Sequence, residues 1–488
     1  DGLLTSFAWV AGAVYAGAGT LPNVRITSTR VDQALPAAPL TAPTATDAGV
    51  GLLSAGTYQY KGVFLSAAGV ETEAGPASSA LTIAATRYIN LTAIPLGAAG
   101  EDVSGRRLYR TSDAGTTYYR LATINDNTTT TYTDNTADLT GNTEISTGRA
   151  ALPPCRYLVE HHHRACGAGS LGADGDERTL YISNFGEPEV SPASPNLTLV
   201  TEGTRISLSG EVDGKIMALA SHGDKLWVWT ATAMFALTGD MPLDYSLQPF
   251  AQVGCVAHRT ACSLRDALYW LAADGVYRGV EGRGIERISD DIRGFIDGLT
   301  ASDLAAATAV CWDNRYYLFT PAGVRWFDTQ YGVWGENTTW PFALATVGGF
   351  TGDGLSRFFA AEQDTGTAWE LEVPDLITDD GTAIFTHWAS ADMDFGLPGR
   401  EKRLHYLGAV WKVTTGTASV SLTTGTGTIV ETITQDLSVA PVTGGLVSRL
   451  YQRVGEAARS EWFAVSIQSQ GADELELLSV DGSWSLCT

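Results

Sequence analysis

Short apolar or alternating runs that end at glycine, aspartate, asparagine or threonine recur along most of the chain. Three of them, KLWVWT (225–230), ALYWLA (267–272) and RYYLFT (315–320), combine aromatic and aliphatic residues over only six positions. Runs of this length bounded by turn residues are typical of strands, whereas helices need longer periodic segments. The pattern therefore predicts an all-β chain.

From residue 153 onward these runs are grouped in units of roughly 40 residues, the spacing of propeller blades. Each unit has an apolar strand, a polar turn such as the one at His222, an aromatic strand, a second turn and another strand. Four-stranded blades arranged around an axis produce this pattern. The units lie at 153–189, 215–240, 259–289, 304–336 and 341–372. With 7–30 as part of a further blade, we expect about six blades.

Two regions depart from this pattern and predict separate β-sandwiches. A segment rich in proline, alanine and threonine (34–49) precedes six or so short strands between 52 and 137, which resemble a fibronectin type III module inserted within or just after the first blade. Beyond 382 the strands are longer and are joined by threonine and glycine turns. The expected domains are 1–40 (first part of the propeller), 41–150 (inserted sandwich), 151–378 (main blades) and 379–488 (C-terminal sandwich).

One hairpin of the inserted module, RLYRTSDAGTTYYRL (107–121), resembles the Asp-box repeated in sialidase-type propellers. We expect Asp113 to bond backbone amides in the turn and Gly115 to adopt positive φ, with Leu108, Tyr118 and Leu121 packed in the sandwich. The box occurs once, and outside the propeller. A propeller glycosidase is therefore the least favoured function, and because no catalytic motif occurs in a supporting context, we expect no enzyme.

Composition narrows the possible partners. The 488 residues are 44% hydrophobic and 17% charged, and the net charge is −23, which argues against a groove lined with lysine and arginine that clamps nucleic acid but not against a surface past which nucleic acid slides. The six cysteines are scattered and are expected to be free thiols. No run is apolar for long enough to span a membrane. The chain starts at Asp1 without Met or a signal pattern, so we expect a processed or unrecorded segment before it.

The most conspicuous polar cluster is the triplet 161–163 of histidines. If all three lie in a strand, His161 and His163 share a face and could supply part of a metal site. No recognised spacing provides the remaining ligands, so we favour a polar blade strand, a subunit interface or a lumen, and expect no cofactor. The acidic turn at 172–177 lacks the bidentate glutamate of a calcium loop and is expected to be solvated.

Three longer stretches resemble the tail nozzle proteins of short-tailed bacteriophages, also called packaged-DNA stabilisation or tail hub proteins. They are GRGIERISDDIRGFI (282–296), CWDNRYYLFTPAGVRWFDTQYGVW (311–334) and the closing SRLYQRVGEAARSEWFAVSIQSQGADELELLSVDG (448–482). The inserted sandwich is also similar to modules found in phage virion proteins. The resemblance covers the propeller and the C-terminal region.

This resemblance implies a structural virion protein of the phage tail. Nozzle proteins form a hexameric ring below the portal and its adaptor, continue the DNA channel, retain the packaged genome, and carry fibre, spike or needle proteins at the tail tip. An acidic wall lets double-stranded DNA pass without sequence-specific binding, because it repels phosphates. The loops 171–178 and 185–195 are candidate channel or gate loops, and their acidic residues are Asp174, Asp176, Glu177, Glu187 and Glu189. The alternative is a tail or baseplate module that binds a host receptor or glycan.

Overall fold

The computed structural model separates the chain into two compact units, Asp1–Trp369 and Glu370–Thr488. It describes residues 6–172, 175–192, 199–208, 210, 214–280, 282–337, 340, 344–350, 356–361, 367–371, 378–379, 382–383, 385–390, 393, 398, 400–413, 417–424, 429–436, 447–453, 459–460, 462–470 and 475–486. The two units are described separately below.

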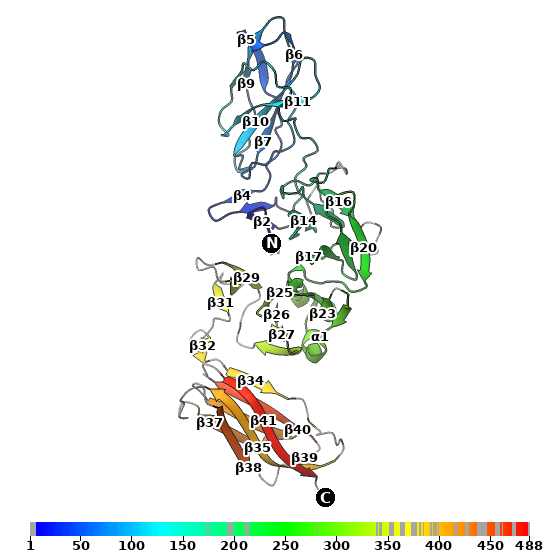
Figure 1. Cartoon of the computed structure of the whole chain (residues 1–488), viewed down its shortest axis with the longest axis vertical. Helices are drawn as coiled ribbons and strands as arrows, with labels where there is room; N and C mark the ends of the chain where they lie inside the picture. Colours follow the sequence, from blue (N-terminus) through cyan, green and yellow to red (C-terminus); the bar gives the residue numbers. More distant parts are fainter. Residues whose placement is uncertain are drawn as a thin grey trace. The chain divides into compact units, whose positions relative to one another are not determined.

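The propeller of the first unit consists of six antiparallel sheets that follow one another along the chain, apart from the inserted domain between the first two (Figure 1). Five have four strands and the sixth has three described strands. Their bounds are β1 (Ser6–Val10), β2 (Ala13–Gly17), β3 (Val24–Ile26), β4 (Val31–Gln33); β13 (Tyr157–His161), β14 (Arg164–Ala168), β15 (Thr179–Ile182), β16 (Thr204–Ser207); β17 (Ala218–His222), β18 (Lys225–Trp229), β19 (Met234–Thr238), β20 (Ser246–Ala251); β21 (Cys262–Leu264), β22 (Ala267–Ala272), β23 (Gly275–Val280), β24 (Gly284–Arg287); β25 (Thr308–Trp312), β26 (Arg315–Thr320), β27 (Gly323–Asp328), β28 (Val333–Asn337); and β29 (Leu344–Phe350), β30 (Ser356–Ala361), β31 (Ala368–Leu371).

The predicted aromatic runs are the second strands of the blades. β22 is buried at every position and β26 at all but its first, because both faces of a blade pack on neighbouring sheets. Trp229, Trp270 and Tyr316 are fully buried. The all-β prediction and the propeller-like architecture are confirmed.

The sheets pack against each other in chain order. The first strand of each sheet contacts the first strand of the next, from β1 and β13 through β17, β21 and β25 to β29. Apolar side chains fill each junction: Val10 and Leu158 lie between the first two blades, and Leu180 and Val228 between the second and third. Trp229 and Trp270 join the third and fourth blades with ring centroids 5.5 Å apart. This successive packing forms the propeller core.

The inserted domain follows the first blade and precedes the second. Its strands are β5 (Thr44–Leu53), β6 (Gly56–Tyr58), β7 (Tyr60–Leu65), β8 (Leu81–Ile83), β9 (Arg87–Thr92), β10 (Gly105–Thr111), β11 (Tyr118–Ile124) and β12 (Tyr132–Asp134). They form the sheets β11-β10-β7 and β12-β9-β5 and the small pair β6-β8. A fully buried ion pair, Arg110 Nη1 to Asp134 Oδ2 at 2.7 Å, links the two larger sheets.

The Asp-box-like hairpin is β10 and β11, joined by a turn. Leu108 is buried in the sandwich as predicted. The expectation for Gly115 is wrong: Ala114 has the positive φ, 48°, because the turn bends one residue earlier. Asp113 does bond a backbone amide, but that of Thr57 on β6, at 2.7 Å. The box therefore ties two strand pairs of the sandwich together.

Asn23 holds the entry and the exit of the inserted domain close together. Its backbone carbonyl accepts a hydrogen bond from the Ala34 amide at 2.9 Å. Its side-chain Nδ2 donates to the carbonyls of Leu152 and Pro153 at 3.1 and 2.8 Å. Ala34 and Leu152 also lie in one hydrophobic cluster. Both connections thus enter the core between the first two blades.

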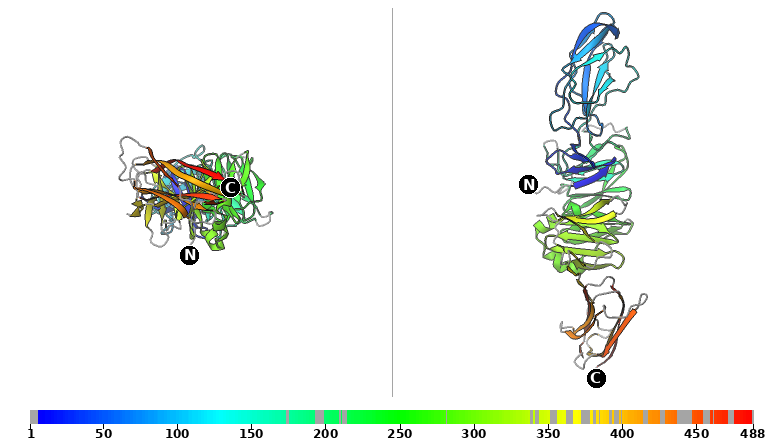
Figure 2. Two further views of the ribbon diagram at one scale, coloured as in Figure 1. Left: turned by 90° about the horizontal axis from the view of Figure 1, so that it is seen from below. Right: turned by 90° about the vertical axis from the view of Figure 1, so that its left-hand side faces the viewer.

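The second unit is a β-sandwich whose two layers are visible in Figure 2. One sheet has the order β34-β40-β36-β37; in the other, β35 pairs with β38, β39 and β41. The strands are β34 (Phe385–Ala389), β35 (Lys402–Val413), β36 (Thr417–Thr424), β37 (Ile429–Asp436), β38 (Val447–Arg453), β39 (Arg459–Ser460), β40 (Phe463–Gln470) and β41 (Leu475–Leu486), preceded by the short pair β32 (Thr378–Asp379) and β33 (Thr382–Ala383).

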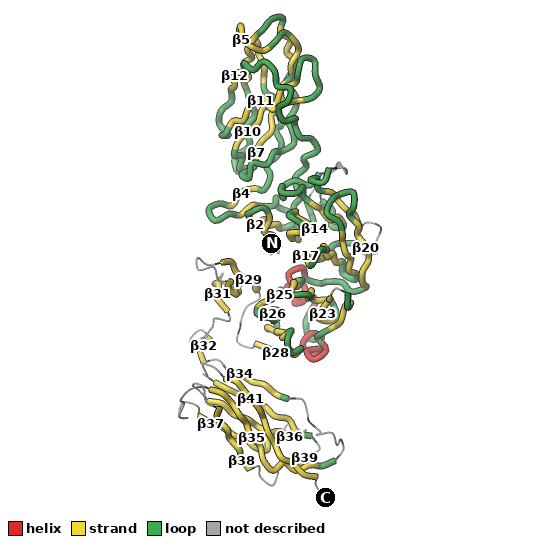
Figure 3. The backbone as a smooth tube through the Cα atoms, in the orientation of Figure 1, coloured by secondary structure: helices red, strands yellow, loops and turns green. Residues whose placement is uncertain are grey.

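The described helices are short and lie near the fourth and fifth blades (Figure 3). They are η1 (His258–Thr260), η2 (Asp290–Ile292), α1 (Arg293–Asp297) and α2 (Ala301–Ala306). Thr300 caps α2 in a capping box with Asp303. None of the helices in the described part of the chain has the length and apolar character needed to cross a membrane.

Candidate functional site

Two of the acidic residues expected at a gate lie instead where the inserted domain meets the propeller. Glu187 Oε2 pairs with Arg149 Nη2 at 2.9 Å and accepts a hydrogen bond from Asn184 Nδ2 at 3.0 Å. Arg149 also donates from its amide to Glu73 and from Nε to the Glu71 carbonyl, both at 2.7 Å. One arginine therefore connects the inserted domain to the second blade.

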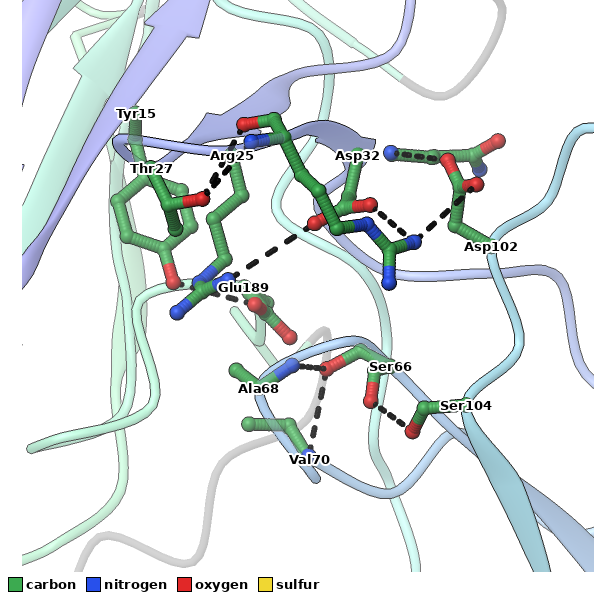
Figure 4. Close-up of polar contacts among 12 residues, drawn as sticks. Tyr15, Arg25, Thr27, Asp32, Ser66, Ala68, Val70, Asp102, Ser104 and Glu189 are labelled. Atoms are coloured by element: carbon green, nitrogen blue, oxygen red, sulfur yellow. Dashed lines mark hydrogen bonds and ion pairs between the residues drawn. The ribbon is translucent and has the colours of Figure 1, made fainter. Parts of the chain in front are cut away.

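Glu189 lies in the interior of this junction and is only 1% exposed (Figure 4). Tyr15 on β2 donates its hydroxyl hydrogen to Oε1 at 3.1 Å. Burial raises the pKa of the Glu189 carboxyl to about 7, although the Ser66 hydroxyl, Tyr15 and Arg25 act in the opposite direction. The side chains of a channel wall are exposed, whereas the Glu189 carboxyl is buried next to Tyr15, Ser66 and Arg25.

A second set of contacts joins the first blade to the inserted domain. Asp32, 2% exposed, pairs with Arg30 Nη2 at 2.6 Å and with Arg25 at 3.9 Å. Asp102 of the inserted domain accepts a hydrogen bond from the Gln33 amide at 2.9 Å and lies 3.9 Å from Arg30. Figure 4 shows Asp32 of the first blade and Asp102 of the inserted domain on the two sides of these contacts.

A small apolar cluster, Leu35, Val70 and Val190, lies within the same junction. Backbone hydrogen bonds reinforce it: Leu152 donates to the Glu189 carbonyl at 2.8 Å, and Ser191 donates to the Ala150 carbonyl at 2.9 Å. We call the whole region the insertion junction; its polar members are Tyr15, Arg25, Arg30, Asp32, Gln33, Ser66, Glu71, Glu73, Asp102, Arg149, Glu187 and Glu189. It contains ion pairs, hydrogen bonds and apolar contacts together.

The other expected gate loop has local contacts. Asp176 accepts hydrogen bonds from the Arg178 amide at 3.0 Å and the Thr179 hydroxyl at 3.1 Å, which fixes the turn before β15. Glu177 pairs with Lys215 at 2.8 Å. Asp174 lies outside the described residues.

The histidine triplet does not lie within one strand, so the expectation that His161 and His163 share a strand face is wrong. β13 ends at His161, and His162 and His163 form the turn to β14 with φ of 48° and 60°. Two successive residues with positive φ make the tight turn that suits a twisted hairpin. The rings of His161 and His162 stack with their centroids 4.0 Å apart, and the His163 ring packs edge to face against Phe185. Within the described residues, no group of His, Cys, Asp and Glu could hold a metal ion.

The histidine turn belongs to a row of contacts between the first turns of successive blades. His161 Nδ1 lies 2.9 Å from the Ser221 hydroxyl, and His222 Nδ1 lies 2.6 Å from the Ser263 hydroxyl. Arg265 continues the row with a hydrogen bond to Asn314 of the fifth blade. The second and third of these contacts border a polar cavity of about 580 Å³, lined by Ser221, His222, Gly223, Ser263, Arg265, Asp266, Val280 and Arg283.

His258, on η1 before the fourth blade, is a further buried ionisable group that the sequence did not single out. Its Nδ1 accepts a hydrogen bond from the Leu219 amide at 3.2 Å, and its Nε2 lies 3.0 Å from the Ser6 hydroxyl. Ser6 bonds both backbone groups of Leu158. Burial lowers the pKa of His258 to about 4, with a smaller effect of Arg259. These contacts connect four blades.

Tyr15, Asp32 and Asp102 of the insertion junction also carry no sequence pattern that marks them as site residues. Asp32 lies in β4 next to Val31 and carries no motif. In the sequence, Asp32 is distinguished only by its position at the end of the first β-rich segment, just before the segment 34–49 that is rich in proline, alanine and threonine. The junction depends on residues from segments up to 174 positions apart, as between Tyr15 and Glu189, so local patterns could not identify it.

Comparisons with known proteins do not assign this chain to a family. No family model matches it, and no curated protein matches it. Among solved structures, it is similar to the AfRom2 CNH domain (TM-score 0.26, 8% identity, covering 57% of this chain and 84% of that one). It is also similar to AztD of Citrobacter koseri (0.24, 9%, 65% and 95%) and to the extracellular domain of the putative hybrid two component system BT4673 of B. thetaiotaomicron (0.26, 10%, 93% and 66%). At these TM-scores the similarities carry no argument about function.

Proposed function

We propose that the chain is a non-enzymatic structural subunit of a phage tail: a ring-forming nozzle that continues the DNA channel, helps to retain packaged DNA and anchors tail-tip or fibre proteins. This proposal rests on one observation: the prominent charged and polar groups form contacts between the domains and blades of the chain. At the insertion junction they join the inserted domain to two blades, and at the first turns they join blade to blade. Such multiple attachment suits a part that transmits force between neighbouring proteins.

Two further features support a channel role. The chain carries a net charge of −23, so a six-membered ring would carry on the order of −140, which disfavours adhesion of DNA phosphates. The stretch 282–296, part of the resemblance to nozzle proteins, forms β24, η2 and α1 and packs with Ile296 in the core between the fourth and fifth blades. In this proposal the partners are an adaptor protein above the ring and fibre, spike or needle proteins below it.

The decisive experiment is imaging of the purified full chain by electron microscopy, together with its mass in solution. We expect a six-fold ring with a channel at least ~20 Å wide, enough for B-DNA, whose major groove alone is about 12 Å across. Short DNA added at 150 mM salt should not be retained on the immobilised ring. A stable monomer or trimer, or tight salt-sensitive DNA binding, would contradict the proposal.

A tail or baseplate module that binds a host glycan is the second candidate, and the cavity at the first turns favours it. Arg265, which bonds the Asn314 side chain, and Arg283 both line this cavity and give it positive charge. A glycan array would test this function. Binding of an acidic saccharide that is lost in Arg283→Ala, with the protein still folded, would support it over the nozzle.

A further inference from the structure

Two free cysteines lie side by side where the fourth and fifth blades meet. Cys262 is on β21 and Cys311 is on β25, the first strands of their sheets. The Cys311 thiol donates a hydrogen bond to the Cys262 sulfur, with the two Sγ atoms 3.3 Å apart. Both side chains pack on the hydrophobic core between these blades. The fold therefore brings together two thiols that are 49 positions apart in the sequence.

Buried tyrosines next to the two cysteines pack the fourth blade against the fifth. Cys262 is paired with Tyr269 across β21 and β22, and Cys311 is paired with Tyr316 across β25 and β26. Residues paired in this way share a face of the sheet. The two tyrosine rings stack with their centroids 5.5 Å apart, and neither residue is more than 1% exposed. The stacked rings thus hold the two cysteine-bearing sheets against each other.

The two sulfurs need only a small movement to form a covalent bond. The S–S distance of a disulfide is about 2.05 Å, so the sulfurs must approach each other by about 1.2 Å. Cysteine has a single side-chain torsion, and rotation about it at both residues moves the sulfurs together. Both cysteines are half-buried and within reach of a small oxidant. In contrast, three other described cysteines are at most 1% exposed: Cys155, Cys166 and Cys255.

We propose that Cys262 and Cys311 are an oxidation site, at which a disulfide bond links the fourth blade to the fifth. The oxidant is a small-molecule disulfide such as oxidised glutathione. One protein thiolate attacks it, forms a mixed disulfide and releases one glutathione; the second protein thiolate then displaces the other glutathione. Two S–H bonds of the protein are broken and one S–S bond is formed. The two electrons and two protons pass to the oxidant, which leaves as two glutathione thiols.

The bond stabilises the propeller by restraining the unfolded chain. A cross-link between residues 49 positions apart removes conformational entropy from the unfolded state. In a unit of this size we expect the melting temperature to rise by about 4 °C. The bond has the same effect in a single chain and in a ring, so the oxidation site is independent of the proposed function.

Peptide mapping of the full chain tests the bond. The purified protein is incubated with oxidised glutathione at pH 8, because burial raises the pKa of the Cys262 thiol and only a thiolate reacts. The remaining thiols are alkylated in denaturant, and the monomer band of a non-reducing gel is digested with trypsin, which cleaves after lysine and arginine. Cys262 and Cys311 then lie in separate peptides, 260–265 and 294–315.

We expect these two peptides to be joined by a disulfide, at least tenfold more often than in protein kept with a reducing agent. Cys262→Ser and Cys311→Ser should each abolish the joined peptide. Cys255→Ser, which changes a fully buried cysteine outside the pair, should retain it. If folded parent protein gives only the two alkylated peptides, or one peptide with a stable glutathione adduct, the two sulfurs do not meet and the proposal is wrong.

The melting temperature tests the effect of the bond separately. The oxidised parent protein should melt about 4 °C above the reduced one. Cys262→Ser treated with the same oxidant should show no rise. A joined peptide with an unchanged or lower melting temperature would overturn the stabilising role of the bond.

Discussion

Replacing Glu189 with glutamine tests whether the insertion junction holds a buried carboxyl with a raised pKa. The ordinary value for glutamate is about 4.5, and burial raises it to about 7. The folded chain therefore binds this proton more tightly than the unfolded chain does. The favourable contribution of the protonated carboxyl is complete below about pH 4.5, and it is lost as the pH rises through 7.

This pKa shift corresponds to a free-energy difference of about 3 kcal/mol between pH 4 and pH 8. Glutamine is neutral at every pH and can still accept the Tyr15 hydroxyl hydrogen. We therefore expect Glu189→Gln to match the parent protein at pH 4 and to be more stable at pH 8 by about 3 kcal/mol. In a unit of this size the difference is on the order of 4 °C in melting temperature.

Calorimetry of the parent and variant at pH 4, 6 and 8 measures this difference, and taking the difference cancels the other titrating groups. Glu144→Gln is the matched control, because this exposed carboxyl of the inserted domain is solvated before and after unfolding. A constant difference across the pH range, or a variant less stable at pH 8, would refute the raised pKa of Glu189.

Three further predictions address the blades and the inserted domain. Burial lowers the pKa of His258 to about 4. The stabilising contribution of the neutral imidazole is therefore complete above pH 6.5 and is lost as the pH falls toward 4. His258→Gln cannot be protonated, so the variant should lose about 3 kcal/mol less stability in acid than the parent protein, as measured by denaturant titration. Gly254→Ala would place Cβ 1.9 Å from a backbone oxygen and should cost more than ~2 kcal/mol in stability, whereas Gly210→Ala, with open space, should cost under ~0.5. Arg110→Leu leaves the Asp134 carboxylate buried without its cation and should destabilise the inserted domain by about 3–5 kcal/mol, seen as earlier proteolysis between residues 44 and 134; wild-type resistance would contradict this.

The blade strands could be predicted from the sequence because their signal is local. KLWVWT became β18, from Lys225, and ALYWLA became β22, from Ala267, since aromatic runs between tight turns fit a sheet buried on both faces. The positions of individual turns were harder to predict from the sequence. His162 and His163 were expected in a strand, but a two-residue turn ends the strand at His161.

The insertion junction could not be predicted from local patterns. Glu187 and Glu189 follow a glycine and flank a proline in the sequence, which resembles an exposed loop. Their environment depends on Arg149 and Tyr15, which other segments of the chain bring to them. The burial of an acidic residue is a property of the tertiary contacts, and composition carries no information about it.

The clamp at Asn23 has a consequence for how such a chain can diversify. Because Ala34 and Leu152 lie in one cluster and are both hydrogen-bonded to Asn23, one through its backbone and the other through its side chain, the segment between them begins and ends at nearly the same place. A domain whose termini are close together could replace that segment without altering the path of either neighbouring blade. Recombination or engineering could therefore exchange the inserted sandwich for another module while the propeller sequence stays unchanged.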